Sequence, residues 1–320
     1  MFMAEIEKIN NDFVNLFREG RPLLENGCGK AMNVCREEAF RHFEALGGVP
    51  YKTEDYWYTD LSSVLGLDYK IVLKYIAQDV DLKEVFRCAV PDLLTNLILT
   101  VNGWYFKENA PIEIPEGVIV CGLQEAGVKY PHLLESHYNR YTPAAAKDGM
   151  IALNTAFAQD GLFVYIPKNT VVERPLQVVN LLRAKADLMA FQRNLIVVEA
   201  GAQATMLVCD HTLSDNRFLM NNTTEVYLGE GAHLDYYQVQ NQHLGASQIN
   251  SLLISEQRNS VFESNLVTLY GGMIRNNQYV ALNGEGGECH LYGIYILDKS
   301  QHVDNYSYID HIAPHCTSNE

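Results

Sequence analysis

The sequence predicts a mainly β protein built on a right-handed parallel β-helix, a solenoid of stacked coils, with a small N-terminal helical region. Three observations support this prediction. Apolar residues recur every three or four positions near the amino terminus, short β-branched runs dominate from about residue 96, and Gly or Asn marks turns at intervals of 28 to 30 positions. We expect a mainly helical region over residues 1–110 and the β-helix core over residues 111–320.

Two short amphipathic helices are expected first. One apolar face consists of Ile6, Ile9, Phe13, Leu16 and Phe17, and a second consists of Met32, Cys35, Ala39, Phe43 and Leu46. Gly47 and Gly48 follow directly and are expected to end the second helix. The aromatic-rich stretch over residues 52–61 has no clear period, so it is expected to be an ordered loop or short strand whose rings dock on a neighbouring element.

Short runs of β-branched and aromatic residues, bounded by Gly, Pro or Asn, predict strands in the rest of the chain. They cover residues 96–101, 117–121, 163–166, 176–179 and 195–198. Residues 130–147 interrupt this pattern and read as helix or loop. The three alanines over 144–146 indicate a last helical turn before the sheet resumes at about Asp148.

The corners of the coils give the most informative signal. Gly201 and Gly231 are 30 positions apart, Gly231 and Asn259 are 28 apart, and Asn259 and Gly287 are 28 apart. A further step of 28 reaches His315. Gly and Asn tolerate the left-handed backbone that such corners need. Stacked coils would also align equivalent side chains, so internal ladders of Thr, Asn and His are expected.

A sandwich of β-hairpins is the competing architecture. Its turn signals would fall every ~8–12 residues without any longer repeat. The longer period persists over at least four corners, which favours the solenoid.

Composition and charge limit the class of protein. The 320 residues are 48% hydrophobic and carry a formal net charge of −15, which disfavours nucleic-acid binding and anionic membrane surfaces. No signal peptide or membrane span is evident, so a cytoplasmic location is expected. The seven cysteines, Cys88 among them, are scattered and form no C-x-x-C pair, so we expect mostly reduced, buried thiols.

Several segments resemble the SufB/SufD family of iron–sulfur cluster assembly scaffold proteins. The segments at 153–177 and 193–201 resemble the first coils of that family's β-helix core. Near the end, His302, Asp304, His311, Pro314 and Ser318 match an H-x-D…H-x-A-P…S pattern. The segments at 37–47 and 54–61 resemble a SufD-type opening, although Tyr56 intervenes before Trp57.

The resemblance implies a scaffold that pairs with a SufB-like subunit and works with a SufC-like ABC ATPase. It also implies a homodimer for the isolated protein, and iron–sulfur clusters handled by the assembled complex rather than a cofactor in this chain. Family members continue through further coils with a Cys-x-His-Gly segment and through a C-terminal helical domain that binds the ATPase. This sequence contains no such segment, so we expect a form truncated or cleaved at its carboxy terminus.

No catalytic or cofactor-binding residue is predicted. The five family-matched residues His302, Asp304, His311, Pro314 and Ser318 are expected to be structural, since buried polar groups in a solenoid need partners on neighbouring coils. Cys289 and Cys316 are the residues with the best chemistry for a metal contact, but their spacing forms no ligand motif, so no metal site is predicted.

The competing function is a carbohydrate-active enzyme on a β-helix, either a polysaccharide lyase or a hydrolase. Such an enzyme needs paired or calcium-bound carboxylates in an exposed groove. The coil region has no clustered acidic motif, and the sequence contains no phosphate-binding loop, so the ATPase role belongs to a partner. The favoured prediction is therefore a scaffold that is not an enzyme.

Overall fold

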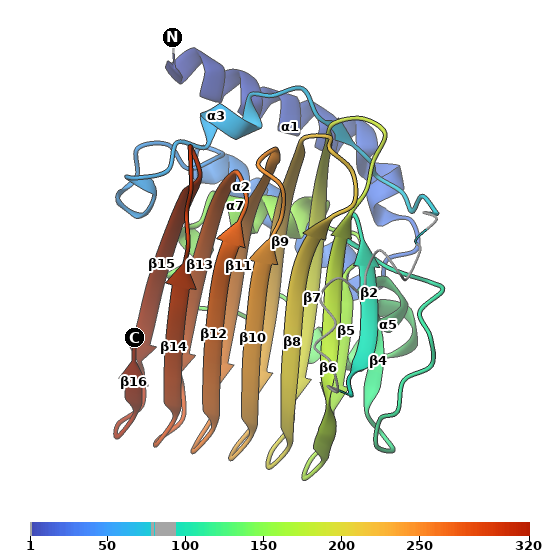
Figure 1. The fold of residues 1–320 in the computed structure, drawn as a ribbon, viewed down its shortest axis with the longest axis vertical. Helices are drawn as coiled ribbons and strands as arrows, with labels where there is room; N and C mark the ends of the chain where they lie inside the picture. The colour runs from blue at the N-terminus through green and yellow to red at the C-terminus, as the bar shows by residue number, and fades with distance from the viewer. Residues whose placement is uncertain (1, 78–79, 81–93) are drawn as a thin grey trace.

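The structure, a computed structural model, describes residues 2–77, 80 and 94–320. It is a β-solenoid of two parallel sheets with helices packed along one side (Figure 1). The predicted mainly β fold, with its parallel solenoid core and small N-terminal helical region, is confirmed.

The elements follow one another in this order. The N-terminal region contains α1 (Phe2–Glu25), α2 (Lys30–Ala45), the 3₁₀ turn η1 (Glu54–Tyr56), α3 (Ser62–Leu65), β1 (Lys70–Ile71), β2 (Asn96–Val101), β3 (Trp104–Tyr105) and β4 (Ile119–Gly122). Then come α5 (Leu123–Lys129), α6 (Pro131–His137), the 3₁₀ turn η3 (Ala145–Lys147) and α7 (Gly149–Phe157). The coils consist of β5 (Leu162–Ile166), β6 (Val171–Leu182), β7 (Leu188–Val198), β8 (Gln203–Thr212), β9 (Phe218–Leu228), β10 (His233–Asn241), β11 (Ala246–Glu256), β12 (Val261–Tyr270), β13 (Met273–Leu282), β14 (Glu288–Tyr295), β15 (His302–His311) and β16 (Thr317–Asn319).

Alternate strands belong to alternate sheets, as a solenoid requires. One sheet, here called sheet A, has the order β15-β13-β11-β9-β7-β5-β4, with β1 also paired to β7. The other, sheet B, has the order β16-β14-β12-β10-β8-β6-β2-β3. Pairing between coils is parallel throughout, and the antiparallel pairs β2–β3 and β4–β5 lie at the first-coil end. Each coil therefore contributes one strand to each sheet.

The corners that lead from sheet A to sheet B repeat one conformation. Their central residue has positive φ: 57° at Asn169, 69° at Gly201, 65° at Gly231, 53° at Asn259, 72° at Gly286 and 59° at His315. At five of these corners its N–H donates to a carbonyl of the next coil, as from Gly201 to Glu230 over 2.8 Å and from Gly231 to Arg258 over 2.8 Å. Gly and Asn therefore recur in the sequence because each corner needs a left-handed residue whose N–H can bond a carbonyl of the next coil.

Two details of the predicted corners change. The left-handed residue of the fourth predicted corner is Gly286, not Gly287, because β14 already begins at Glu288 and the turn is completed one residue earlier. Asn169 makes an equivalent corner one coil earlier, which the predicted series did not include. The step to His315 is confirmed.

The interior of the solenoid is apolar at one end of its cross-section and polar at the other. The apolar part includes Ile166, Val198, Leu234 and Phe262. The polar part contains chains of side-chain hydrogen bonds between coils, such as Asn194 to Asn222 over 3.1 Å and Asn250 to Asn276 over 3.0 Å. The predicted internal ladder is confirmed for asparagine, since Asn222, Asn250, Asn276 and Asn305 lie in register on successive coils, and these contacts satisfy amides that would otherwise be costly to bury. The threonine and histidine ladders stay predictions.

The helical predictions are mostly right. Ile6, Ile9, Phe13 and Phe17 are buried on one face of α1, and Gly47 and Gly48 take positive φ directly after α2. Leu46 does not join the buried face, because it caps α2 and is 38% exposed.

The aromatic stretch over residues 52–61 differs from the prediction. Only Tyr56 docks, because η1 turns its ring into the core. Trp57 and Tyr58 are 71% and 80% exposed.

A helix was also missed. The sheet does not resume at Asp148: α7 occupies Gly149–Phe157, with the Asp148 carboxylate accepting the amide hydrogen of Met150 as its N-cap. All nine residues of α7 are buried, so no amphipathic pattern marks it in the sequence.

The domain boundary, the cysteines and the possibility of a membrane span are taken in turn. The predicted domain boundary between residues 110 and 111 stays a prediction. Before it, β2 already pairs with β6 of the solenoid, and after it, the helices α5, α6 and α7 follow β4. Six cysteines are free thiols, and Cys88 lies outside the described residues. No helix in the described part of the chain is both long and apolar enough to cross a membrane.

Candidate functional site

The two sheets differ in what covers their outer faces. Helices α1, α2 and α7 pack along sheet A, and β7 is buried at every position. No described helix covers the outer face of sheet B over β10, β12 and β14, and burial in β12 alternates along the strand (Figure 1). We call this surface of β10, β12 and β14 the open face.

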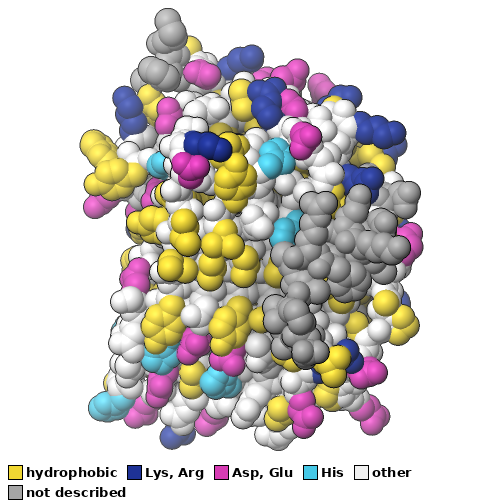
Figure 2. All heavy atoms as spheres, in the orientation of Figure 1, with side chains coloured by type: hydrophobic (Ala, Val, Ile, Leu, Met, Phe, Trp, Pro, Cys, Tyr) yellow, Lys and Arg dark blue, Asp and Glu magenta, His cyan; other side chains and the backbone are white. Residues whose placement is uncertain are grey.

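Apolar side chains gather at the centre of the open face, as Figure 2 shows from that side. Val267 lies in register with Ile294, and Asn265 lies in register with Tyr292. The exposed fraction is 46% for Tyr292 and 56% for Ile294. The apolar residues of the open face are Tyr237, Val239, Val267, Leu269, Tyr292, Ile294 and Ile296. A contiguous apolar patch of this kind is typical of a protein-binding surface.

A polar band borders this patch nearer the corners. Asp235, Glu263 and His290 lie in register on three successive coils. The His233 imidazole contacts the Asp235 carboxylate over 2.9 Å, and the amide of Asn319 lies 3.0 Å from the His290 ring. An apolar centre with a polar rim is the usual anatomy of a protein–protein interface. The described part of the open face therefore has the character of a protein-binding surface.

The predicted site residues His302 and Asp304 lie on β15, at the opposite sheet. The Thr59 hydroxyl contacts His302 Nε2 over 3.1 Å and donates to Asp304 over 2.5 Å. Arg275 also pairs with Asp304 and donates to the backbone carbonyl of Asp55 over 2.6 Å. These contacts tie the N-terminal region to the solenoid, and the expected structural role stays a prediction.

His311, Pro314 and Ser318 lie together around the last corner. His311 Nε2 is 2.9 Å from the Ser318 hydroxyl, and the Pro314 carbonyl accepts a hydrogen bond from Gly286 over 3.4 Å. The first contact joins β15 to β16, and the second joins two successive corners of the solenoid.

Cys289 and Cys316 both contact the apolar core of the solenoid. Cys289 is fully buried beside Glu256, and burial raises the pKa of its thiol. Burial also raises the pKa of the Glu256 carboxyl to about 8. Cys316 donates to the Gly284 carbonyl over 3.3 Å. In the described residues, no group of three or more His, Cys, Asp or Glu side chains could hold a metal ion.

Sequence reasoning missed the open face. The sequence of β12 and β14 does indicate it, because apolar residues such as Val267 and Ile294 stand at outward positions as well as at inward ones. Recognising it requires knowing which strands the helices cover, and that depends on how α1, α2 and α7 pack.

Comparison with known proteins gives two family models that together span most of the chain. Residues 7–178 match the SufBD protein N-terminal region, and residues 181–320 match the SufBD core domain of the SUF system for iron–sulfur cluster assembly.

Individual relatives are similar over different lengths. An iron–sulfur cluster assembly SufBD family protein of Arabidopsis thaliana is 31% identical over 53% of this chain and 36% of its own length. One from Synechocystis is 24% identical over 85% of this chain and 61% of its own length. One from Staphylococcus saprophyticus is 24% identical over 97% of this chain and 70% of its own length. The chain thus spans less than two thirds of the length of the first two relatives.

Proposed function

Because the chain belongs to the SufBD family of iron–sulfur cluster assembly proteins, we propose that it is a non-catalytic scaffold subunit of that machinery. In this role the protein binds partner subunits and positions them, while the iron–sulfur cluster is the cargo of the assembled complex. The observation that carries the proposal is the match of both family models to consecutive halves of the chain.

We assign the chain to the SufD type and its first partner to the SufB type. The support is the SufD-like opening over 37–47 and 54–61, which the structure places in α2 and around η1. The open face supports a stable protein partner, since Tyr292 and Ile294 are large and exposed within an apolar patch that a polar band borders. A homodimer is the state proposed for the protein when the partner is absent.

A SufC-like ATPase is the second proposed partner, and a cytoplasmic location accompanies the proposal. The sequence contains no phosphate-binding loop of its own, so nucleotide hydrolysis belongs to that partner. Cys289 and Cys316 stay the residues of this chain with the best chemistry for contacting iron.

The carbohydrate-active alternative is not favoured. The family models concern cluster assembly, and the acids of the open face, such as Asp235 and Glu263, lie side by side in register on adjacent strands of one sheet. A sugar hydrolase needs two carboxylates facing each other across its substrate.

The proposal is tested by co-expressing the complete gene product that contains these residues with SufB-like and SufC-like subunits. We expect all three to co-purify as one complex. Failure of the folded protein to associate with either subunit would overturn the proposed function.

The docking surface is tested separately with Ile294→Arg. A charge at the centre of the open face is expected to weaken association with the SufB-like subunit at least about tenfold, as for a central interface residue. Val171→Arg is the matched control, because Val171 is 49% exposed on β6 of the same sheet but lies outside the open face. Equal affinity of both variants would reject the open face and leave the family function standing.

A further inference from the structure

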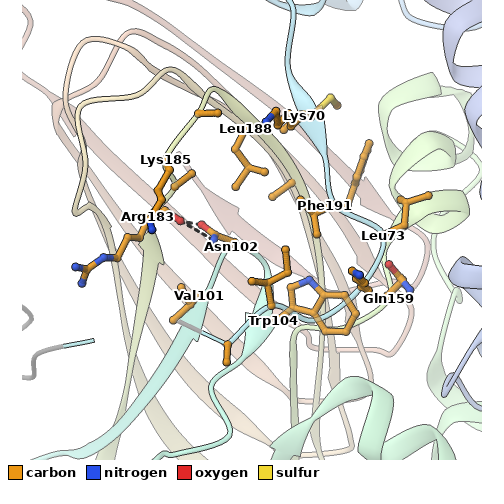
Figure 3. Close-up of a pocket in the computed structure, with 18 of the residues that line it drawn as sticks. Lys70, Leu73, Val101, Asn102, Trp104, Gln159, Arg183, Lys185, Leu188 and Phe191 are labelled. Carbon is orange, nitrogen blue, oxygen red and sulfur yellow. Dashed lines mark hydrogen bonds between the residues drawn. The ribbon is translucent and has the colours of Figure 1, made fainter. Parts of the chain in front are cut away.

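A cavity of about 420 Å³ lies near the first-coil end of the solenoid, away from the open face. Its walls come from the segment around β1, the β2–β3 hairpin, the turn between β6 and β7, and the start of β7 (Figure 3). A volume of this size suits a small organic molecule.

The interior of the cavity is aromatic and aliphatic. Trp104 lies on one side of it and Leu188 on the other, while Leu73 and Phe191 lie together at one end (Figure 3). Phe157 stacks on Phe191 with ring centroids 5.1 Å apart. Such walls favour the apolar body of a ligand by removing it from water.

The described residues that line the cavity carry a net charge opposite in sign to that of the whole chain. The chain as a whole has a net charge of −15, yet the described residues that line the cavity include Lys70, Lys74, Lys185 and Arg183, and none of these described lining residues is an acid. Arg183 points away from the cavity (Figure 3). None of the three lysines forms an ion pair with a described residue. A cationic rim around low-dielectric walls attracts anions.

The walls are held in place by hydrogen bonds. Asn102 donates to the Arg183 carbonyl over 2.8 Å and accepts from its amide over 2.9 Å, which fixes the β6–β7 turn against the β2–β3 hairpin. The Lys70 amide donates to the Asp187 carbonyl over 2.9 Å, and Gln159 donates to the Leu23 carbonyl over 2.8 Å. A preformed cavity costs a ligand little ordering of the protein.

We propose that this cavity binds a small amphipathic organic anion, with its apolar body against Trp104 and Phe191 and its anionic group among Lys70, Lys74 and Lys185. The shared chemistry is a carboxylate, sulfonate or phosphate attached to an aromatic or aliphatic body. The residues that line the cavity lie outside the proposed docking surface, so the test of the cavity is independent of the test of the open face.

The first experiment uses the fluorescent aromatic sulfonate 8-anilinonaphthalene-1-sulfonate as the probe. The chain has two tryptophans, so Trp57→Phe leaves Trp104 as the only tryptophan donor. We expect saturable binding with energy transfer from Trp104 to the probe, weakened by added salt. Absence of saturable binding or of energy transfer would overturn the proposal.

The charge requirement is tested with Lys70→Glu/Lys185→Glu in the Trp57→Phe background. We expect affinity for the probe to fall at least about fivefold, the effect of about one lost ion pair. The control Lys8→Glu/Lys168→Glu changes the net charge equally at exposed lysines elsewhere, and Ile294→Arg checks binding at the open face. An equal loss of probe affinity in Lys8→Glu/Lys168→Glu, or a loss seen only in Ile294→Arg, would contradict the assignment of the probe to this cavity.

Competition distinguishes an anion site from a merely apolar one. Decanoate is expected to displace the probe at lower concentration than decanol, which has the same chain without the charge. Circular dichroism and the urea midpoint of each variant establish that it is folded, and Lys70→Gln/Lys185→Gln repeats the test without introducing acids. Equal displacement by decanoate and decanol would remove the anionic part of the proposal.

Discussion

Sheet A and sheet B are built from the same repeating coil but meet different surroundings. In sheet A, β9 and β11 are buried on both faces, even though they carry Asn221, Thr223 and Ser251. In sheet B, β10 and β12 alternate between buried and exposed residues. One solenoid thus provides a second core beneath its helices on one side and an open surface on the other.

The polar residues of sheet A show how that second core is satisfied. Arg193 and Glu225, whose side chains are 0% and 5% exposed, form an ion pair of 2.6 Å beneath the segment that joins α6 to α7. Glu225 also accepts the amide hydrogens of Asn139 and Arg140 over 3.1 Å and 3.0 Å. Buried charges of this kind fix how the covering segments sit, because any displacement leaves a charge without a partner.

The largest expected effect follows from that pair. Arg193→Met should lower the free energy of unfolding by about 3–5 kcal/mol, because Glu225 would stay buried without its cation. The matched control Arg217→Met breaks an equally short but exposed pair with Asp187 and should cost at most about 1 kcal/mol. Urea unfolding of both variants measures the difference, and similar costs would remove the distinction between buried and exposed pairs.

A smaller effect separates the apolar parts of the two outer faces. Leu219→Ala on the outer face of sheet A should cost about 2–4 kcal/mol, because Leu219 is fully buried among residues of α1, α2 and α7. Val267→Ala on the open face should cost about 1 kcal/mol or less. Thermal and urea unfolding would measure both, and equal costs would mean that the open face is covered in the isolated protein.

The smallest predicted effect concerns Glu256, at the end of β11. Its folded-state pKa of about 8 lies above the unfolded value, so the folded state holds this proton more tightly. The contribution of Glu256 to stability is therefore fully present below about pH 4.5 and is lost as pH rises towards 8, by about 2 kcal/mol after allowance for relaxation. Glu256→Gln should remove this dependence.

The urea midpoints of the parent and Glu256→Gln at pH 5 and pH 8 measure the effect. The variant should gain stability relative to the parent at pH 8 and little at pH 5. A parent that loses no more stability than the variant between these pH values would show that Glu256 is ionised in the fold.

The sequence allowed prediction of the coils but not of what covers them. Left-handed corners are restricted to few residue types, so Gly201, Gly231 and Asn259 are visible as a period. Burial of α7 depends on contacts between distant segments, and its nine residues carry no amphipathic signal. The family-matched Asp304 could be identified from its motif, whereas its contact with Thr59 depends on the packing of η1 against β15.

The most direct test of the account is hydroxyl-radical footprinting of the protein alone and in complex with the SufB-like subunit. Tyr237, Tyr292 and Ile294 of the open face should be oxidised in the isolated protein and protected in the complex, while the exposed Tyr58 should stay reactive in both. Unchanged oxidation of the open face in a complex that forms would contradict its role as the docking surface.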